Sequence, residues 1–390
     1  MIPYGKQEIN QQDLDAVLEV LNSDFLTQGP KVPAFERVVA QYTGAKHSVA
    51  VNSATSALHI ACLALGVESG DVVWTTPITF VASANCVLYC GGSVDFVDVD
   101  SVTNNMSPEA LREKLKQVKA SGQQLPKVVI PVHLTGLPCD MAAIHNLSIE
   151  YGFKIIEDAS HAIGGRYLGK AVGACEYSDI TVFSFHPVKI ITTAEGGLAT
   201  TNDSDLAEKM GLYRSHGVTR DSHLMEGDPD GAWYYEQVAL GYNYRMTELQ
   251  AALGLSQMTR LDQFVAARHS LAGRYLELLD GLPIKLPCYS ESSYSGLHLF
   301  VIRLDLSKLK LSRKEVFDQL RQSGIGVNVH YIPVHTQPYY KKRGFKQGDF
   351  PKSETYYEEA ISLPMFHLMR QGQQDEVILA LKNILLGHLK

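Results

Sequence analysis

The sequence predicts an α/β fold in which a mostly parallel sheet is wrapped by helices and is followed by a smaller α+β domain. From about residue 46 to residue 201, short β-branched runs alternate with segments of helical period. Several runs are apolar on consecutive residues, which is typical of strands covered on both faces. Near Met246 the pattern changes to a long helical stretch followed by isolated strands. Such a mixture indicates a second, separate domain.

The alternation in the first region predicts the individual elements. We expect a helix at Thr55–Leu65, ended by Gly66, and another at Pro108–Val118, capped by Ser107. Strand-helix-strand repeats of this kind place neighbouring strands parallel. The predicted strands are Ser48–Val51, Val72–Thr75, Ser93–Val97, Val128–Val132, Lys154–Ile156, Ile180–Phe183 and Gly197–Thr201.

The second region predicts one long helix and a small mixed domain. Thr247–Leu282 contains few helix breakers, so we expect a single helix that bridges the two domains. We place the large domain at 1–255 and the small domain at 256–390. The small domain is expected to contain strands at Leu297–Leu304 and Gly326–Tyr331 and helices at Arg313–Gln322 and Gln373–Leu389.

Composition excludes several classes of protein. The chain has 390 residues, 45% of them hydrophobic and 20% charged, which is ordinary for a globular protein and not for a disordered one. A formal net charge of −7 gives no general attraction for nucleic acid or an anionic membrane, so an anionic substrate requires local donors. No stretch reaches the roughly 18 apolar residues of a membrane span, and the N-terminus lacks a signal-peptide core. We therefore expect a cytoplasmic protein.

The six cysteines contain no Cys-x-x-Cys pair. In a chain of this length without a secretion signal, free buried thiols are expected rather than disulfides or a zinc site. The cysteines are Cys62, Cys86, Cys90, Cys139, Cys175 and Cys288.

Two common phosphate-binding motifs are absent. No Gly-x-Gly-x-x-Gly occurs, which excludes the dinucleotide fingerprint. The segment Gly164–Ala171 nearly matches a Walker A loop, but Ala171 replaces the Ser or Thr that would hold magnesium and no helical pattern follows. We expect a hairpin there.

Three other segments are better candidates, because each follows a predicted buried strand. Asn52–His59 opens a helix with small residues, so its free backbone amides could bind an anion; a plain Ser/Thr cap is the alternative. Asp158 follows the predicted strand Lys154–Ile156 and could pair with a pyridine nitrogen, or could only cap a helix. Lys189 lies in an apolar connection, where a lysine is either ion-paired or neutralised for covalent chemistry. Together, an anion seat, a carboxylate and an amine are what pyridoxal phosphate requires.

These segments resemble the DegT/DnrJ/EryC1/StrS family of sugar aminotransferases, and the resemblance extends over essentially the whole chain. It implies the aspartate-aminotransferase-like fold, type I, of pyridoxal-phosphate enzymes. The motifs that carry it are Asp158-x-x-His161, Ser184-Phe185-His186-x-x-Lys189, Glu195-Gly196-Gly197, Arg214-Ser215-His216-Gly217 and Gly241–Ala252.

The resemblance also implies roles for single residues. Lys189 would form the Schiff base with the cofactor and move the proton, Asp158 would hold the pyridine nitrogen, and Phe80 would stack on the ring. His161, where many relatives carry Gln, would pack beside the ring. The cofactor phosphate would be held by Ala54, Thr55, Ser184 and, from the other subunit of a homodimer, Asn243.

The closest resemblance within the family is to transaminases of pseudaminic acid biosynthesis. It implies transfer of an amino group from L-glutamate to C4 of a UDP-linked 4-keto-6-deoxy-N-acetylhexosamine. Enzymes for other nucleotide-linked 4-keto sugars, of the perosamine or bacillosamine type, and a sugar dehydratase of the same fold are the alternatives; Lys189 argues against the dehydratase, which carries histidine there. The implied substrate-binding residues are Tyr4, Asp24, Phe25, Leu26, Thr27, Ala54, Ser184, Asn243, His330, Tyr331 and Ile332.

Overall fold

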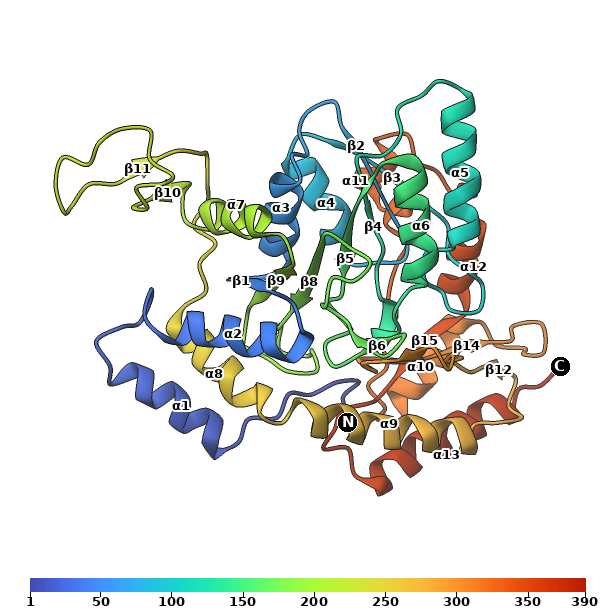
Figure 1. Ribbon diagram of the computed structural model, residues 1–390. Helices are drawn as coiled ribbons and strands as arrows, with labels where there is room; N and C mark the ends of the chain where they lie inside the picture. The colour runs from blue at the N-terminus through green and yellow to red at the C-terminus, as the bar shows by residue number, and fades with distance from the viewer.

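A seven-stranded sheet in the order β1-β9-β8-β5-β4-β2-β3 forms the centre of the computed structural model, which describes residues 1–390 (Figure 1). Strand β9 alone runs against the others, because it pairs antiparallel with both β8 and β1. The remaining neighbours pair parallel, so the predicted mostly parallel sheet is confirmed. The strands are β1 (His47–Val51), β2 (Val72–Thr75), β3 (Ser93–Phe96), β4 (Val128–Ile130), β5 (Lys154–Asp158), β8 (Ile180–Ser184) and β9 (Gly197–Thr201).

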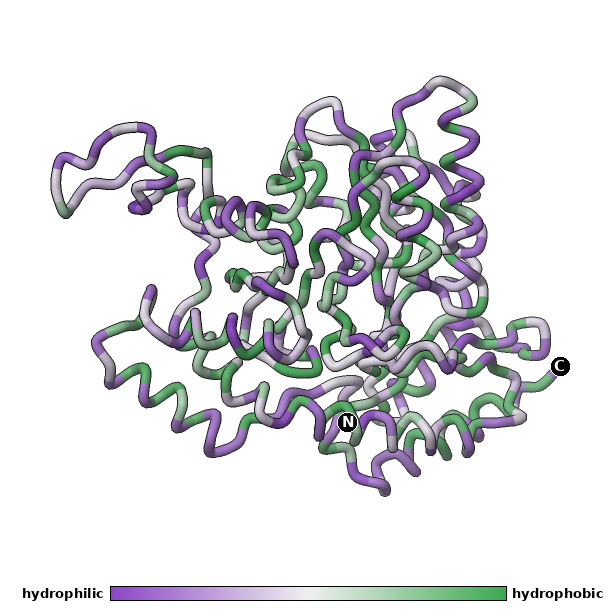
Figure 2. The backbone as a smooth tube through the Cα atoms, viewed as in Figure 1, coloured by the Kyte–Doolittle hydropathy of each residue, from purple (hydrophilic) through white to green (hydrophobic).

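Helices pack on both faces of this sheet (Figure 1). Ser107 caps α5 as the sequence predicts, by accepting a hydrogen bond from a first-turn amide, and Ser53 caps α3 in the same way. Figure 2 shows green and purple residues alternating along α5, as expected for a helix with one buried face. The helices of this part are α1 (Gln11–Leu21), α2 (Lys31–Thr43), α3 (Ala54–Ala64), α4 (Ala82–Tyr89), α5 (Pro108–Ala120), α6 (Met141–Tyr151), α7 (Ser204–Arg214) and α8 (Glu248–Met258).

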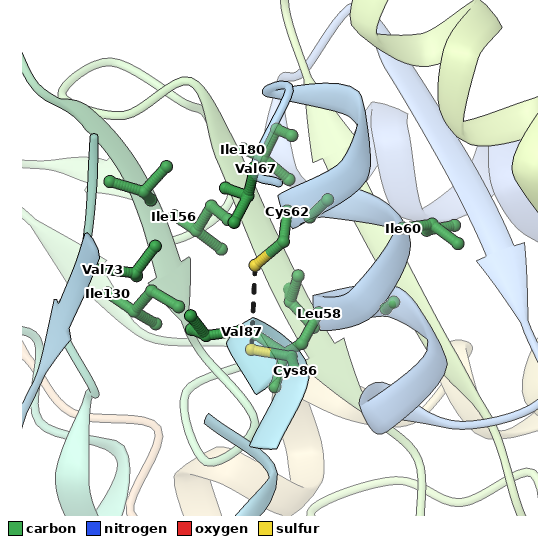
Figure 3. Packing of buried hydrophobic residues seen from close by; sticks show 14 of the residues in the cluster. Leu58, Ile60, Cys62, Val67, Val73, Cys86, Val87, Ile130, Ile156 and Ile180 are labelled. Atoms are coloured by element: carbon green, nitrogen blue, oxygen red, sulfur yellow. Dashed lines mark hydrogen bonds between the residues drawn. The ribbon is translucent and has the colours of Figure 1, made fainter. Parts of the chain in front are cut away.

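Helix α3 is buried on almost all sides, between the sheet and its neighbours α4 and α7. Burial of each large aliphatic side chain contributes about 1.5–3 kcal/mol, so this cluster holds the helix firmly against the strand ends. Figure 3 shows α3 and α4 contributing Leu58, Cys62, Cys86 and Val87 to a cluster with Val73, Ile130, Ile156 and Ile180 of the sheet.

The C-terminal part has its own apolar cluster around a three-stranded antiparallel sheet, β12-β14-β15. Ile2, at the N-terminus, is buried in the same cluster and bridges to Ile325. The two ends of the chain therefore build one body. The elements that build this cluster are α9 (Leu261–Leu278), β12 (Ile284–Lys285), β14 (Phe300–Leu304), α10 (Arg313–Gln322), β15 (Ala360–Leu363) and α13 (Gln371–Leu386). Three further helices of this part lie outside it: η2 (Val334–Thr336) and α11 (Pro338–Lys341), whose Val334 and Tyr340 pack in the cluster of the central sheet, and α12 (Pro351–Glu359).

Two sequence predictions are wrong here. The expected helix Thr247–Leu282 is two helices, because the chain turns at Thr259 and Arg260, where the guanidinium contacts Glu8 and Asp13. The expected strand Gly326–Tyr331 is absent; only Asn328 makes a single bridge, to Ser362, and the segment then turns into a cavity.

The predicted hairpin Gly164–Ala171 is confirmed as the antiparallel pair β6 (Arg166–Tyr167) and β7 (Lys170–Ala171), which β13 (Ser293–Tyr294) extends. A second hairpin, β10 (Val218–Thr219) with β11 (Glu236–Gln237), projects away from the body of the molecule (Figure 1). No helix combines the length and the apolarity that crossing a membrane requires. All six cysteines are free; four are buried as expected, whereas Cys90 is half-buried and Cys288 is exposed.

Candidate active site

A cavity of about 860 Å³ lies at the carboxyl ends of the central strands. Three of these ends supply one wall: β1 leads into the start of α3, β5 ends at Asp158, and β8 ends at Ser184. The facing wall comes from His298, His330 and Tyr331 of the C-terminal part. Ligands of open α/β sheets bind at such strand ends, so this cavity is the candidate site.

The start of α3 offers free backbone amides to the cavity. The first intrahelical hydrogen bond runs from Ala57 N to Ser53 O, so the amides of Ala54 and Thr55 precede it. Gly197 makes this arrangement possible, because a Cβ there would lie 2.4 Å from the nitrogen of Ala54. Free amides at the positive end of a helix dipole form an anion site.

Asp158 is held in place by two hydrogen bonds. Ser83 Oγ donates to Oδ2 at 2.6 Å, and the backbone N–H of Ser160 donates to Oδ1 at 3.1 Å. Both hydrogen bonds fix the position of the carboxylate. Asp158 is buried at the cavity wall and can therefore present a fixed negative charge to a bound cation.

Lys189 lies on the connection between β8 and β9 and faces the same cavity. Burial lowers the pKa of its amine from 10.5 to about 8, and Asp158 limits the decrease by favouring the charged form. With this pKa about a tenth of the amine is unprotonated at pH 7, far more than for an ordinary lysine. An unprotonated lysine amine can attack a carbonyl carbon.

Three neutral rings complete the cavity beside Lys189. His161 Nε2 and the Tyr331 hydroxyl lie 3.0 Å apart, and His330 Nδ1 lies 2.7 Å from Ser362 Oγ. Burial, together with the charge of Lys189, lowers the pKa of His330 to about 3 and that of His161 well below its usual value. Burial also raises the pKa of Tyr331, so its hydroxyl keeps its proton and stays within hydrogen-bond distance of His161 as a neutral group.

These groups fit pyridoxal phosphate. Ala54 and Thr55 could hold its phosphate, Asp158 its protonated ring nitrogen, and Lys189 its aldehyde. Phe80, with 59% of its surface exposed, stands at the mouth of the cavity and offers a ring face. The expected site residues that line the cavity are Tyr4, Ala54, Thr55, Phe80, Asp158, His161, Ser184, Lys189, His330 and Tyr331.

The remaining expected residues lie outside the lining of this cavity. All of them are exposed to solvent in the single chain, and Phe25, Leu26 and Ile332 have about half of their surface exposed. They are Asp24, Phe25, Leu26, Thr27, Asn243 and Ile332.

The sequence analysis missed several lining or supporting residues. Ser83 lies 75 positions before the carboxylate that it contacts, and no local pattern connects the two. His298 precedes a buried strand and has no motif around it. A glycine at position 197 is the one local sign of such tertiary packing, because its lack of a side chain permits the close approach of β9 to α3.

Comparisons with known proteins agree with this chemistry. The model of the DegT/DnrJ/EryC1/StrS aminotransferase family matches residues 7–382. The spore coat polysaccharide biosynthesis protein SpsC of Bacillus subtilis (strain 168) is 38% identical over 389 residues, covering 99% of this chain and 97% of that protein.

Solved structures are similar over the same extent. Helicobacter pylori PseC, an aminotransferase involved in the biosynthesis of pseudoaminic acid, has a TM-score of 0.90 and 30% identity, with 99% of each chain covered. Spr1654 from Streptococcus pneumoniae in its PLP-form has a TM-score of 0.88 and 29% identity, again covering 99% of each chain. The chain therefore belongs to the DegT/DnrJ/EryC1/StrS aminotransferase family and is a sugar aminotransferase with pyridoxal phosphate as its cofactor.

Proposed function

We propose that this sugar aminotransferase moves the amino group of L-glutamate to C4 of a UDP-linked 4-keto-6-deoxy-N-acetylhexosamine. In full, the substrate is UDP-2-acetamido-2,6-dideoxy-β-L-arabino-hexos-4-ulose and the product is UDP-4-amino-4,6-dideoxy-N-acetyl-β-L-altrosamine, used in pseudaminic acid biosynthesis. The observation that carries the transaminase chemistry is Lys189 facing the same cavity as Asp158 and the free amides of α3. The similarity to PseC supports this choice of sugar.

Each residue has a defined task in the proposed reaction. When bound, pyridoxal phosphate supplies a carbonyl for amine exchange and a protonated ring that accepts electrons. Asp158 holds the positive charge of the ring nitrogen, fixed by Ser83 and Ser160. The Lys189 amine takes a proton from the donor carbon and later returns a proton to C4 of the sugar. The amides of α3 anchor the phosphate, so the reacting atoms keep one position.

A second candidate substrate is another nucleotide-linked 4-keto sugar, of the perosamine or bacillosamine type. The identity to SpsC, a protein of polysaccharide biosynthesis, is 38% and exceeds the 30% to PseC. The two candidates share the donor half-reaction and differ only in the sugar. A panel of UDP-, GDP- and dTDP-4-keto sugars, with the products identified by NMR, separates them.

The transaminase proposal is tested by Lys189→Ala. We expect this variant to lose turnover with every sugar and to lose the visible absorbance of the covalently held cofactor, because no other lysine lines the cavity. Lys170→Ala, an exposed change on the β6–β7 hairpin, is the control and should leave both unchanged. Normal turnover in Lys189→Ala would overturn the assignment.

We also propose that the enzyme works as a homodimer with shared sites. The projecting β10–β11 hairpin carries Trp233 and Tyr235 with 71% and 56% of their surfaces exposed, and such aromatic exposure is typical of an interface. Phe80, at the cavity mouth, is likewise uncovered. A second copy supplying Asn243 would explain why this residue lies outside its own cavity. A cytoplasmic location stays a prediction.

A further inference from the structure

A chain of two buried hydroxyls leads from the cavity wall to Asp158. Thr79 lies on the connection between β2 and α4 and lines the cavity, and Ser83, four positions later, lies in the first turn of α4. The Oγ1 atom of Thr79 and the Oγ atom of Ser83 are 2.6 Å apart, and Ser83 Oγ lies 2.6 Å from Oδ2 of Asp158. Because Thr79 is 2% exposed and Ser83 0%, bulk water competes little for these contacts.

The number of protons determines the direction of this chain. Asp158 must be ionised to hold a protonated ring nitrogen, and an ionised carboxylate has no proton to give. Ser83 carries one hydroxyl proton and donates it to Asp158, so in the other contact Thr79 donates to Ser83. The carbonyl oxygen of Phe80 is the weaker acceptor for the Ser83 proton, since it lies 3.4 Å from Oγ. Both O–H dipoles thus point toward the carboxylate, and hydrogen bonds aligned in this way polarise one another.

We propose that Thr79 and Ser83 are a positioning pair that holds Asp158 toward the ring nitrogen of the cofactor. This inference rests on the proposed role of Asp158. Ser83 is the one side chain that hydrogen-bonds to the carboxylate, because the other oxygen is held by the backbone N–H of Ser160. Without Ser83, only one oxygen keeps its donor and the carboxylate can turn away from the cavity. Thr79 makes no hydrogen bond to Asp158 and therefore acts through Ser83.

The packing around the pair keeps both hydroxyls in place. On the side of Ser83, Cys86 and Val87 anchor α4, since both are fully buried in the cluster with α3 and the sheet (Figure 3). On the side of Thr79, the preceding residue Ile78 is fully buried among side chains of the C-terminal part. Threonine is also β-branched, which restricts rotation about χ1. Little ordering of the pair is therefore needed when the cofactor binds.

The test measures the affinity of the cofactor-free protein for pyridoxal phosphate by absorbance titration. We expect Ser83→Ala to weaken binding roughly ten- to a hundredfold, as loss of a hydrogen bond to a charged group does. Thr79→Val keeps the shape and removes a hydrogen bond between neutral groups, so it should weaken binding roughly two- to tenfold. Thr79→Ser keeps the hydroxyl and should bind normally. Thr76→Val is the matched control, because Thr76 is equally buried in the same connection and its hydroxyl has no hydrogen-bond partner.

Two further measurements separate positioning from a merely structural role. If Thr79 acts through Ser83, adding Thr79→Val to Ser83→Ala should cause no further loss of affinity. The kcat of both half-reactions should fall in Ser83→Ala, while the KM for the sugar stays within about twofold of the wild type. Cofactor affinity of Ser83→Ala within about twofold of the wild type would overturn the inference. Equal losses in Thr79→Val and Thr76→Val, or losses that multiply in the double variant, would also overturn it.

Asp158→Asn distinguishes failure of this inference from failure of the proposed role of Asp158. If Asp158→Asn binds the cofactor as tightly as the wild type, the role of the carboxylate is wrong and the positioning pair is rejected with it. If Asp158→Asn binds weakly while Ser83→Ala binds normally, the positioning pair alone is wrong. Weak binding by both variants is the expected result.

Discussion

Lys189 has a lowered pKa because its amine is buried, not because other cations repel it. Asp158, the one charge that acts on it appreciably, favours the protonated form and yet does not restore the ordinary value. Desolvation therefore outweighs the nearby carboxylate. The same burial keeps the surrounding imidazoles neutral, so the amine competes with no other cation for Asp158.

This pKa predicts how the cofactor-free enzyme captures pyridoxal phosphate. Only the unprotonated amine attacks, so the capture rate should fall about tenfold for each pH unit below 8 and level off above it. For a lysine with the ordinary pKa of 10.5, the capture rate would still rise with pH above pH 9. Stopped-flow absorbance across this range measures the rate, and a tenfold rise between pH 9 and pH 10 would contradict the burial argument.

The start of α3 shows how an element brings local sequence and distant packing together. Ser53 caps the helix at the segment for which the sequence left a cap and an anion site open, while Gly197 allows β9 to pass directly beside the first amides. The helix cannot move away from this approach, because its apolar faces are buried against the sheet and α4 (Figure 3).

Gly197→Ala should therefore damage the anion site. The added Cβ would meet the nitrogen of Ala54 and the carbonyl of Ser53 at 2.4 Å, and relieving this overlap should cost about 1–3 kcal/mol of unfolding free energy. We also expect weaker cofactor affinity, measured by absorbance titration. Gly211→Ala is the control: in α7, with nothing within 4 Å of its Cβ, it should stabilise the protein by about 0.5–1 kcal/mol. Equal effects of the two changes would refute the close-approach argument.

The sequence predicted those site residues that lie next to a recognisable strand, and it missed those that reach the site only through tertiary packing. Asp158 and Lys189 follow buried strands directly, and strand ends of a parallel sheet meet at one edge, so their meeting was predictable. Ser83 and His298 reach the site only through tertiary packing, and no spacing reveals them. The turn between α8 and α9 was missed for the same reason, since Arg260 is engaged by Glu8 and Asp13 from the far end of the chain.

At the scale of the whole molecule, the exposed hairpin and the open mouth of the cavity predict a site completed by a second copy. Mixing Lys189→Ala with Asn243→Ala subunits tests this. If Asn243 serves the partner, half of the randomly assembled dimers are mixed and each has one intact site, so about a quarter of wild-type activity should return. If Asn243 serves its own subunit, every site stays defective and no activity returns. Each variant alone is the control.

The two walls of the cavity come from different stretches of chain. The amine, the carboxylate and the phosphate-binding amides come from strand ends between residues 52 and 189, whereas His298, His330 and Tyr331 come from beyond α9. The residues that determine reactivity and those that determine substrate selectivity consequently lie in different parts of the sequence. Substitutions after α9 can retune which donor or sugar is accepted while the groups that handle the cofactor stay intact, so descendants of one ancestor can diversify their substrates without first losing catalysis.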